Sequence, residues 1–102
     1  MPRSFDQWLG NAQELDLPAL IKAAEWDASD AERRAHKGRG GQAVRRAEAQ
    51  QLARQLGELL YFLRFCAKPT RVRPDDWLAY RPVAQRLVAK GQWKAEALEM
   101  FN

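Results

Sequence analysis

The feature that most constrains the fold is an amphipathic pattern from residue 42 to about residue 68. Apolar residues recur every three or four positions there, which is the spacing of one face of an α-helix. From Leu59 onward apolar side chains occur on every side, as in a helix enclosed by other helices or by a second copy of the chain. Pro69 is expected to end this long helix. The stripe consists of Val44, Ala47, Leu52, Leu56, Leu59, Leu63 and Cys66, with Cys66 expected in the core.

Two helices are predicted before it. Ser4 and Gln7 match a capping box, which opens a short helix near the N-terminus. Pro18 suits the first turn of a second helix that extends to about residue 37. Ser29 begins another possible capping box, so the sequence leaves open whether this second helix is continuous.

The last third of the chain predicts shorter helices. Asp75 and Asp76 are expected to cap one, and Pro82 to start another. Gly91 is expected to stop that helix, and residues 92–101 form the last one, which gives a helical hairpin at the C-terminus. No window shows sustained strand alternation. We therefore predict an all-α fold, a compact bundle of about five helices built around the long one.

Composition and charge suit a globular protein with two unlike parts. The 102 residues make one domain, 1–102, and 46% of them are hydrophobic. Residues 1–32 carry two cations against seven acids, whereas residues 33–102 carry fifteen cations against six acids. Such asymmetry indicates either an anionic partner or packing of the acidic arm on the basic body.

The cysteine count and the hydropathy bear on location. A single cysteine excludes an intramolecular disulfide, which favours a reducing compartment. The first residues lack the apolar core of a secretory signal, and the longest apolar stretch is too short to span a bilayer. We expect a cytoplasmic protein that does not associate with membranes.

The richest candidate site is the basic stretch from residue 33 to residue 46. Cations in the last turn of a helix, such as Arg33 and Arg34, are favoured by the helix dipole and need no function. Arg45 and Arg46 are different, because positive charge in the first turn of a helix opposes the dipole. A helix N-terminus after a glycine-rich loop suits backbone phosphates of DNA or RNA. The predicted phosphate-binding residues are Lys37, Arg39, Gly40, Gly41, Arg45 and Arg46.

A second basic stretch follows the long helix. Arg71 and Arg73 alternate with Val72 in an extended segment, so their side chains are expected to point the same way. They would assist phosphate binding if the two basic stretches shared a face. Placement at opposite ends of the long helix would instead prevent one compact site.

Two weaker signals involve tryptophan and the C-terminal hairpin. Trp8 and Trp93 are expected to be partly exposed, as anchors of a protein interface or as platforms for single-stranded bases. The segment around Gly91 also has the helix–turn–helix form of a major-groove reader, although any tight helical hairpin has the same pattern.

No catalytic or metal constellation can be assembled. His36 has no cysteine or histidine partner at metal spacing, and Cys66 has no nearby base. Capping accounts for Asp75 and Asp76. The sequence therefore predicts a protein that is not an enzyme and that uses no cofactor or metal.

Three hypotheses follow from these patterns. The first is a small regulator that binds or associates with nucleic acid through the arginines above. The second is a protein-interaction module, such as an adaptor or inhibitor from a phage or plasmid, whose basic face docks an acidic protein surface. The third is a structural subunit whose acidic arm covers its basic body. A homodimer through the aromatic end of the long helix is compatible with each of them.

Overall fold

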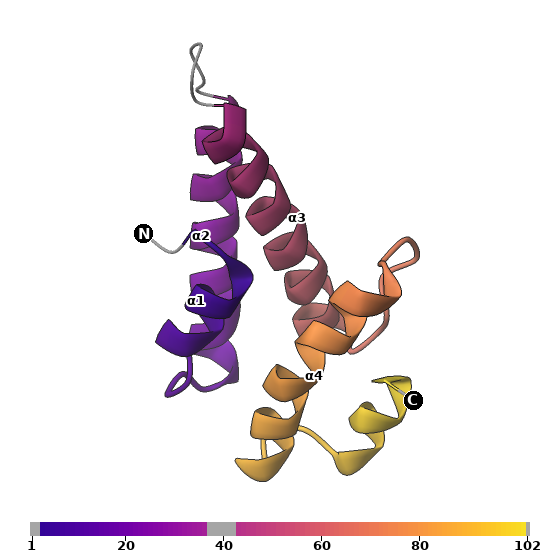
Figure 1. The fold of residues 1–102 in the computed structure, drawn as a ribbon. Coiled ribbons are helices and arrows are strands. Elements are labelled where there is room, and N and C mark those ends of the chain that lie inside the picture. The colour runs from indigo at the N-terminus through magenta and orange to yellow at the C-terminus, as the bar shows by residue number, and fades with distance from the viewer. Residues whose placement is uncertain (1–2, 37–42, 102) are drawn as a thin grey trace.

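A computed structural model describes residues 3–36 and 43–101, and its elements are all helical (Figure 1). The predicted all-α bundle of about five helices is confirmed. None of the helices in these two ranges is long and apolar enough to cross a membrane. The elements are α1 (Phe5–Asn11), α2 (Leu17–His36), α3 (Ala43–Phe65), α4 (Pro74–Ala89) and the 3₁₀ helix η1 (Ala95–Phe101).

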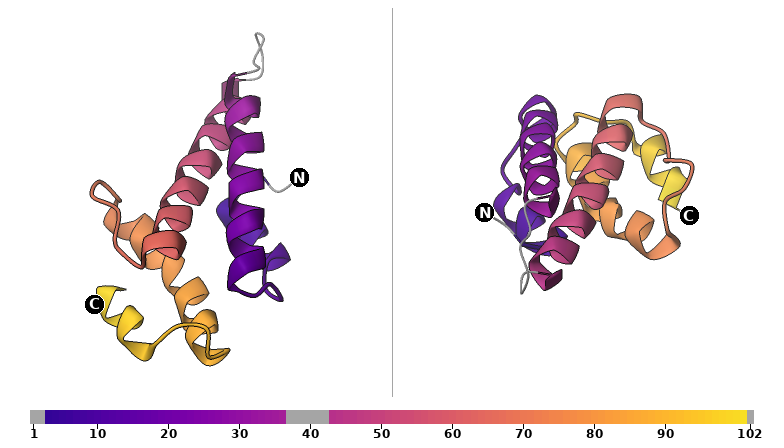
Figure 2. Two further views of the ribbon diagram at one scale, coloured as in Figure 1. Left: turned by 180° about the vertical axis from the view of Figure 1, so that it is seen from behind. Right: turned by 90° about the horizontal axis from the view of Figure 1, so that it is seen from above.

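The long helices α2 and α3 form an antiparallel pair that organises the molecule (Figures 1 and 2). The helix α1 lies against this pair, and α4 with η1 packs around the C-terminal half of α3. The molecule is elongated, with extents of 47 × 26 × 19 Å. The two sides of α3 therefore have different neighbours, with α2 on one and α4 on the other.

Side-chain caps begin the first two helices: the Ser4 cap was predicted, and the Asp16 cap was not. The Ser4 hydroxyl accepts a hydrogen bond from the Gln7 backbone N–H at 3.2 Å, and the Asp16 carboxylate accepts one from the Ala19 N–H at 3.0 Å. The helix α2 is continuous from Leu17 to His36, which settles the question raised by Ser29. Its buried alanines before and after that serine keep one packed face without a break: Ala24, Ala31 and Ala35.

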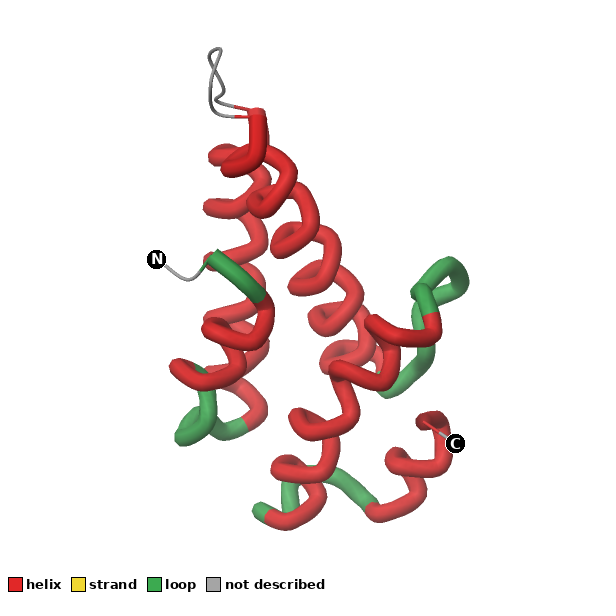
Figure 3. Tube along the Cα trace, in the orientation of Figure 1, coloured by secondary structure: helices red, strands yellow, loops and turns green. Residues whose placement is uncertain are grey.

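The long central helix is shorter at its C-terminal end than predicted. It ends at Phe65, and Cys66 follows with a φ of 48°, in the left-handed region. The expectation that Cys66 lies in the core is wrong, because its left-handed backbone turns the chain away and leaves the residue exposed. The connection that follows doubles back beside α3 before α4 begins (Figure 3).

The two helices predicted on either side of Pro82 are one helix, α4. Pro82 is exposed, so the backbone hydrogen bond that it removes is lost on the solvent side. Tyr80 and Val83 are both fully buried, and packing on both sides of the proline holds the helix together. Gly91 then ends the helix as predicted: its φ is 73°, and the next N–H donates back to the Leu87 carbonyl at 2.9 Å.

An aromatic cluster centred on Phe62 joins α3, α4 and η1. The Phe62 ring, which is fully buried, makes edge contacts with Trp77, Trp93 and Phe101 at centroid distances of 5.1, 4.7 and 5.2 Å. Trp77 and Phe101 also stack on each other at 4.2 Å. One side of the apolar end of the long helix is thus enclosed by helices of its own chain, whereas Tyr61 and Phe65 on the same end stay exposed.

Candidate functional site

The start of α3 carries the two arginines that the sequence singles out. Arg45 is exposed and Arg46 is half-buried. The first turn contains no acidic residue, and neither arginine forms an ion pair with any residue that the structure describes. Positive charge at a helix N-terminus costs typically ~0.3–1 kcal/mol per residue. A bound anion would therefore remove an unfavourable interaction as well as add a favourable one.

The loop before this helix falls outside the described residues. Lys37, Arg39, Gly40 and Gly41 all belong to it. Their part in phosphate binding stays a prediction from sequence.

Arg71 and Arg73 lie in the connection between α3 and α4, and both are exposed. Val72 between them is half-buried and packs against the core. The predicted alternation is therefore present. Neither arginine pairs with a carboxylate within residues 3–36 and 43–101. Nearby, the Lys68 ammonium lies over the Trp77 ring, 5.7 Å from its centroid.

The two basic groups lie on different elements. Arg45 and Arg46 belong to the beginning of α3, and Arg71 and Arg73 belong to the connection that leads into α4. Asp76, near the start of α4, contacts Arg54 and Gln55, which follow Arg46 by eight and nine positions, ~12 Å of helix rise. The groups therefore form two separate basic patches.

The acidic arm neutralises other cations. Glu25 on α2 pairs with Arg64 at 2.6 Å. Asp30 pairs with Arg34 at 3.0 Å and with Arg33 at 3.5 Å, inside its own helix. Among the described ion pairs, the arm thus reaches α3 at one position, Arg64, far from the start of that helix. None of these ion pairs involves Arg45, Arg46, Arg71 or Arg73.

Of the two tryptophans predicted to be partly exposed, Trp93 is and Trp8 is not. Trp8 is 2% exposed, so the expectation of an exposed ring that could anchor an interface is wrong. Its indole N–H donates to the Asp27 carboxylate at 2.8 Å, and this partner on α2 is what allows the ring to be buried. Trp93 is half-buried against Phe62 and offers little free surface.

The exposed tryptophan is instead Trp26, at 73%. It follows the buried Ala24 by two positions, which on a helix turns its side chain ~200° away from the packed face. Counting angular positions along α2 would have found it. A shallow hollow beside it is lined by Trp26, Ser29, Glu32, Arg33 and His36.

The C-terminal hairpin does not form a helix-turn-helix reader. Its second element, η1, is a seven-residue 3₁₀ helix with Phe101 buried in the aromatic cluster. The side chain of Gln92, the residue after Gly91, accepts a hydrogen bond from the Leu17 N–H at 2.7 Å. The turn therefore fastens the C-terminal region to the start of α2.

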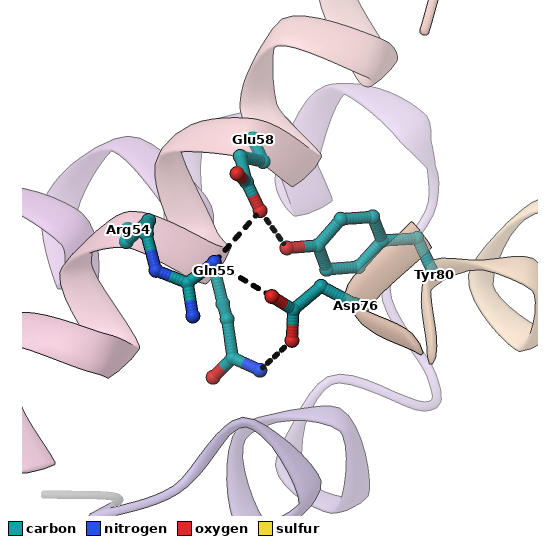
Figure 4. Close-up of polar contacts among 5 residues, drawn as sticks. All are labelled: Arg54, Gln55, Glu58, Asp76 and Tyr80. Atoms are coloured by element: carbon teal, nitrogen blue, oxygen red, sulfur yellow. Dashed lines mark hydrogen bonds and ion pairs between the residues drawn. The ribbon is translucent and has the colours of Figure 1, made fainter. Parts of the chain in front are cut away.

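Sequence reasoning missed a polar cluster between α3 and α4 (Figure 4). Arg54 donates to Asp76 at 2.7 Å and lies 3.5 Å from Glu58. The Gln55 amide donates to the other Asp76 oxygen at 3.2 Å, and the Tyr80 hydroxyl donates to Glu58 at 2.5 Å. Arg54 and Glu58 are four positions apart on α3, which is a local pattern. Their contacts with Asp76 and Tyr80 depend on tertiary packing, so no local sequence pattern signals the cluster as a whole.

The ionisation of this cluster is consistent with a structural role. Burial raises the pKa of the Tyr80 phenol, and its hydrogen bond to Glu58 raises it further, so the group remains protonated. The hydrogen bond with Asp76 raises the pKa of the Arg54 guanidinium. Each polar group contacts another member of the cluster. The arrangement therefore fixes α4 on α3.

Neither metal-binding geometry nor similarity supplies a further clue. Within the described part of the chain, no three His, Cys, Asp or Glu side chains lie together as metal ligands would. No protein-family model matches the sequence, and comparison with curated proteins and with solved structures gives no significant match.

Proposed function

We propose that this protein binds nucleic acid through backbone phosphates and acts by binding rather than by catalysis. The observation that supports it most is the distribution of ion pairs: Arg33, Arg34, Arg54 and Arg64 each contact an acid. The arginines singled out from the sequence, Arg45 and Arg46 at the start of α3 and Arg71 and Arg73 before α4, have no such contact with a described residue. Arg3, Arg81 and Arg86 lack one as well, but they do not lie in the two basic stretches.

The phosphate backbone of a nucleic acid suits this arrangement better than a small anion does. Two basic patches on separate elements are poorly placed to enclose one small ligand, but a long polyanion can contact both. Contacts to phosphates need charge and reach and do not need a fixed motif. The N-terminus of α3 adds N–H groups that have no partner within the helix itself to the Arg45 and Arg46 side chains.

Charge reversal at the start of α3 tests the proposal. The variant Arg45→Glu/Arg46→Glu should bind duplex DNA, single-stranded DNA and RNA more weakly than the wild type at low salt. The slope of log K against log salt should become shallower by up to about two, since each lost phosphate contact lowers it by roughly one.

The matched control is Arg81→Glu/Lys94→Glu, which makes the same change in net charge at two exposed positions elsewhere. If the control weakens binding as much as the α3 variant, net charge rather than a site accounts for the affinity. Negligible binding by the wild type at low salt would refute the proposal.

A second candidate function, a protein-interaction module, is favoured by a different observation. Tyr61 and Phe65 on α3 are 44% and 63% exposed and contact each other at 4.9 Å. Exposed aromatic side chains are enriched in protein interfaces. If this pair forms a homodimer, Phe65→Glu should convert the protein to monomer in light scattering, whereas Leu78→Glu should not. A monomeric wild type would leave an unrelated acidic protein as the partner to seek.

A further inference from the structure

The outward face of α2 carries a line of basic and aromatic side chains without an acid, and the proposed function does not use it. One exposed stripe of this helix follows steps of four, three, four and three residues and carries no acid, while the exposed Glu25 and Glu32 lie beside it. Its members are Lys22, Trp26, Ser29, Arg33 and His36. The shallow hollow beside Trp26 lies along the C-terminal part of this stripe and is bordered by Glu32.

The acids of α2 lie off this stripe, and most have partners elsewhere. Glu25 is held by Arg64, and Asp27 accepts a hydrogen bond from Trp8. Asp30 is held chiefly by Arg34, and its contact with Arg33 is longer, at 3.5 Å. A helix that is acidic in composition therefore presents one acid-free line to solvent, with basic residues on both sides of an exposed indole.

We propose that this stripe is a seat for single-stranded nucleic acid, on which an unpaired base stacks against Trp26 while Lys22 and Arg33 contact the flanking phosphates. The inference rests on the proposed function and names its substrate class. An exposed aromatic ring among cations is how proteins hold single strands without sequence preference, because every base has a face that can stack. The bases of a duplex are paired and stacked on one another, so Trp26 should contribute little to duplex binding.

An acidic peptide bound here would interact with the cations, but the Trp26 indole would contribute only buried apolar area. Stacking on a base uses both. The ring is 73% exposed, so it can meet a base without any rearrangement of the helix. Ser29 and His36, on the same line, offer hydrogen-bond donors to phosphate or base edges.

The test compares oligothymidylate of about 20 nucleotides with a duplex of equal length, using fluorescence anisotropy. Trp26→Ala should weaken binding to oligothymidylate about five- to hundredfold, which corresponds to the loss of one base–aromatic stack. Duplex binding should change less than twofold. Trp26→Phe should retain part of the affinity. The matched control is Leu78→Ala, which removes an exposed apolar side chain from α4.

A second measurement uses the wild-type protein. The other three tryptophans are buried or half-buried, so iodide quenching of fluorescence reports mainly on Trp26. Oligothymidylate should protect this fluorescence from iodide and the duplex should not. Unchanged quenching together with wild-type affinity of Trp26→Ala for oligothymidylate would overturn the inference.

The outcomes separate this inference from the proposed function. If Arg45→Glu/Arg46→Glu loses binding to both single-stranded and duplex DNA while Trp26→Ala binds both as the wild type does, the proposed function is supported and the binding site on α2 is refuted. Failure of the wild type to bind either strand type would refute both. If polyglutamate binds more tightly than oligothymidylate, and Trp26→Ala abolishes this binding, the ligand of the stripe is an acidic protein and not a nucleic acid.

Discussion

Asp76 accepts hydrogen bonds from Arg54 at 2.7 Å and from Gln55 at 3.2 Å, one on each carboxylate oxygen. The sequence assigns this aspartate to capping, but the residue before α4 is Arg73, and no side chain caps the helix there. Asp76 instead points across to α3. Its neighbour Asp75, in the same turn, is exposed. Two adjacent acids at one helix start thus have different roles.

Replacement of Asp76 should therefore cost more stability than replacement of Asp75. Asp76→Ala leaves the half-buried Arg54 and the buried Gln55 without their acceptor, and we expect a loss of ~2–4 kcal/mol in the free energy of unfolding. Asp75→Ala loses only a favourable interaction with the helix dipole, up to about 1 kcal/mol. Urea unfolding followed by circular dichroism measures both. Equal losses would mean that Asp76 acts on the dipole alone.

Tyr80 makes stability depend on pH at the alkaline end. Burial raises the pKa of its phenol above the unfolded value of about 10, so above that pH the folded state binds more protons than the unfolded state. The free energy of unfolding then falls as pH rises, by up to ~1.4 kcal/mol per pH unit for one group. Tyr80→Phe lacks this group.

The measurement for Tyr80 is urea unfolding of the wild type and of Tyr80→Phe at several pH values from about 8 to 11. At the lower end the variant should be less stable by ~1–3 kcal/mol, because Glu58 loses its hydroxyl donor. The difference should shrink as pH rises past the unfolded pKa. Parallel pH profiles for the two proteins would contradict a raised pKa of Tyr80.

The helices could be predicted from sequence because their signals are local. The Ser4 cap, the stripe of α3 and the stop at Gly91 each depend on residues within a turn or two. The junctions were predicted less well, since packing on both sides of Pro82 outweighs the cost of a proline inside a helix. Tertiary packing decides such cases.

The residues of the candidate site were likewise predictable where local position decides their exposure, and not where a distant partner does. Exposure of Arg45, Arg71 and Arg73 follows from their positions beside apolar neighbours. The burial of Trp8 could not be predicted, because it requires Asp27, nineteen residues away, as the acceptor for its indole N–H. The exposure of Trp26 could have been predicted from its angle on α2 alone.

Phe62 and Phe65 provide a direct test of the aromatic cluster, since they lie three residues apart on one helix. Phe62 is fully buried among three aromatic rings, whereas Phe65 is 63% exposed. Phe62→Ala should lower the free energy of unfolding by ~3–5 kcal/mol, because it leaves a cavity. Phe65→Ala should change it by less than about 0.5 kcal/mol. A large loss in Phe65→Ala would indicate that this ring is covered in solution, as in a homodimer.

Cys66 offers a substitution that should stabilise the protein. Its φ of 48° costs a residue with a side chain ~1–2 kcal/mol, which glycine avoids. Glycine also gains freedom in the unfolded chain, worth ~0.5–1 kcal/mol in the opposite direction. Because the thiol is exposed, little packing is lost, and Cys66→Gly should raise the free energy of unfolding by about 0.5–1 kcal/mol.

Cys66→Ala separates the backbone from the thiol, because alanine keeps the strained conformation and should match the wild type within about 0.5 kcal/mol. Urea unfolding under reducing conditions measures all three proteins. Destabilisation by glycine relative to alanine would show that Cys66 does not adopt the left-handed conformation in solution. The stop of α3 at Phe65 would then depend on Pro69 after all, and the helix would extend toward it.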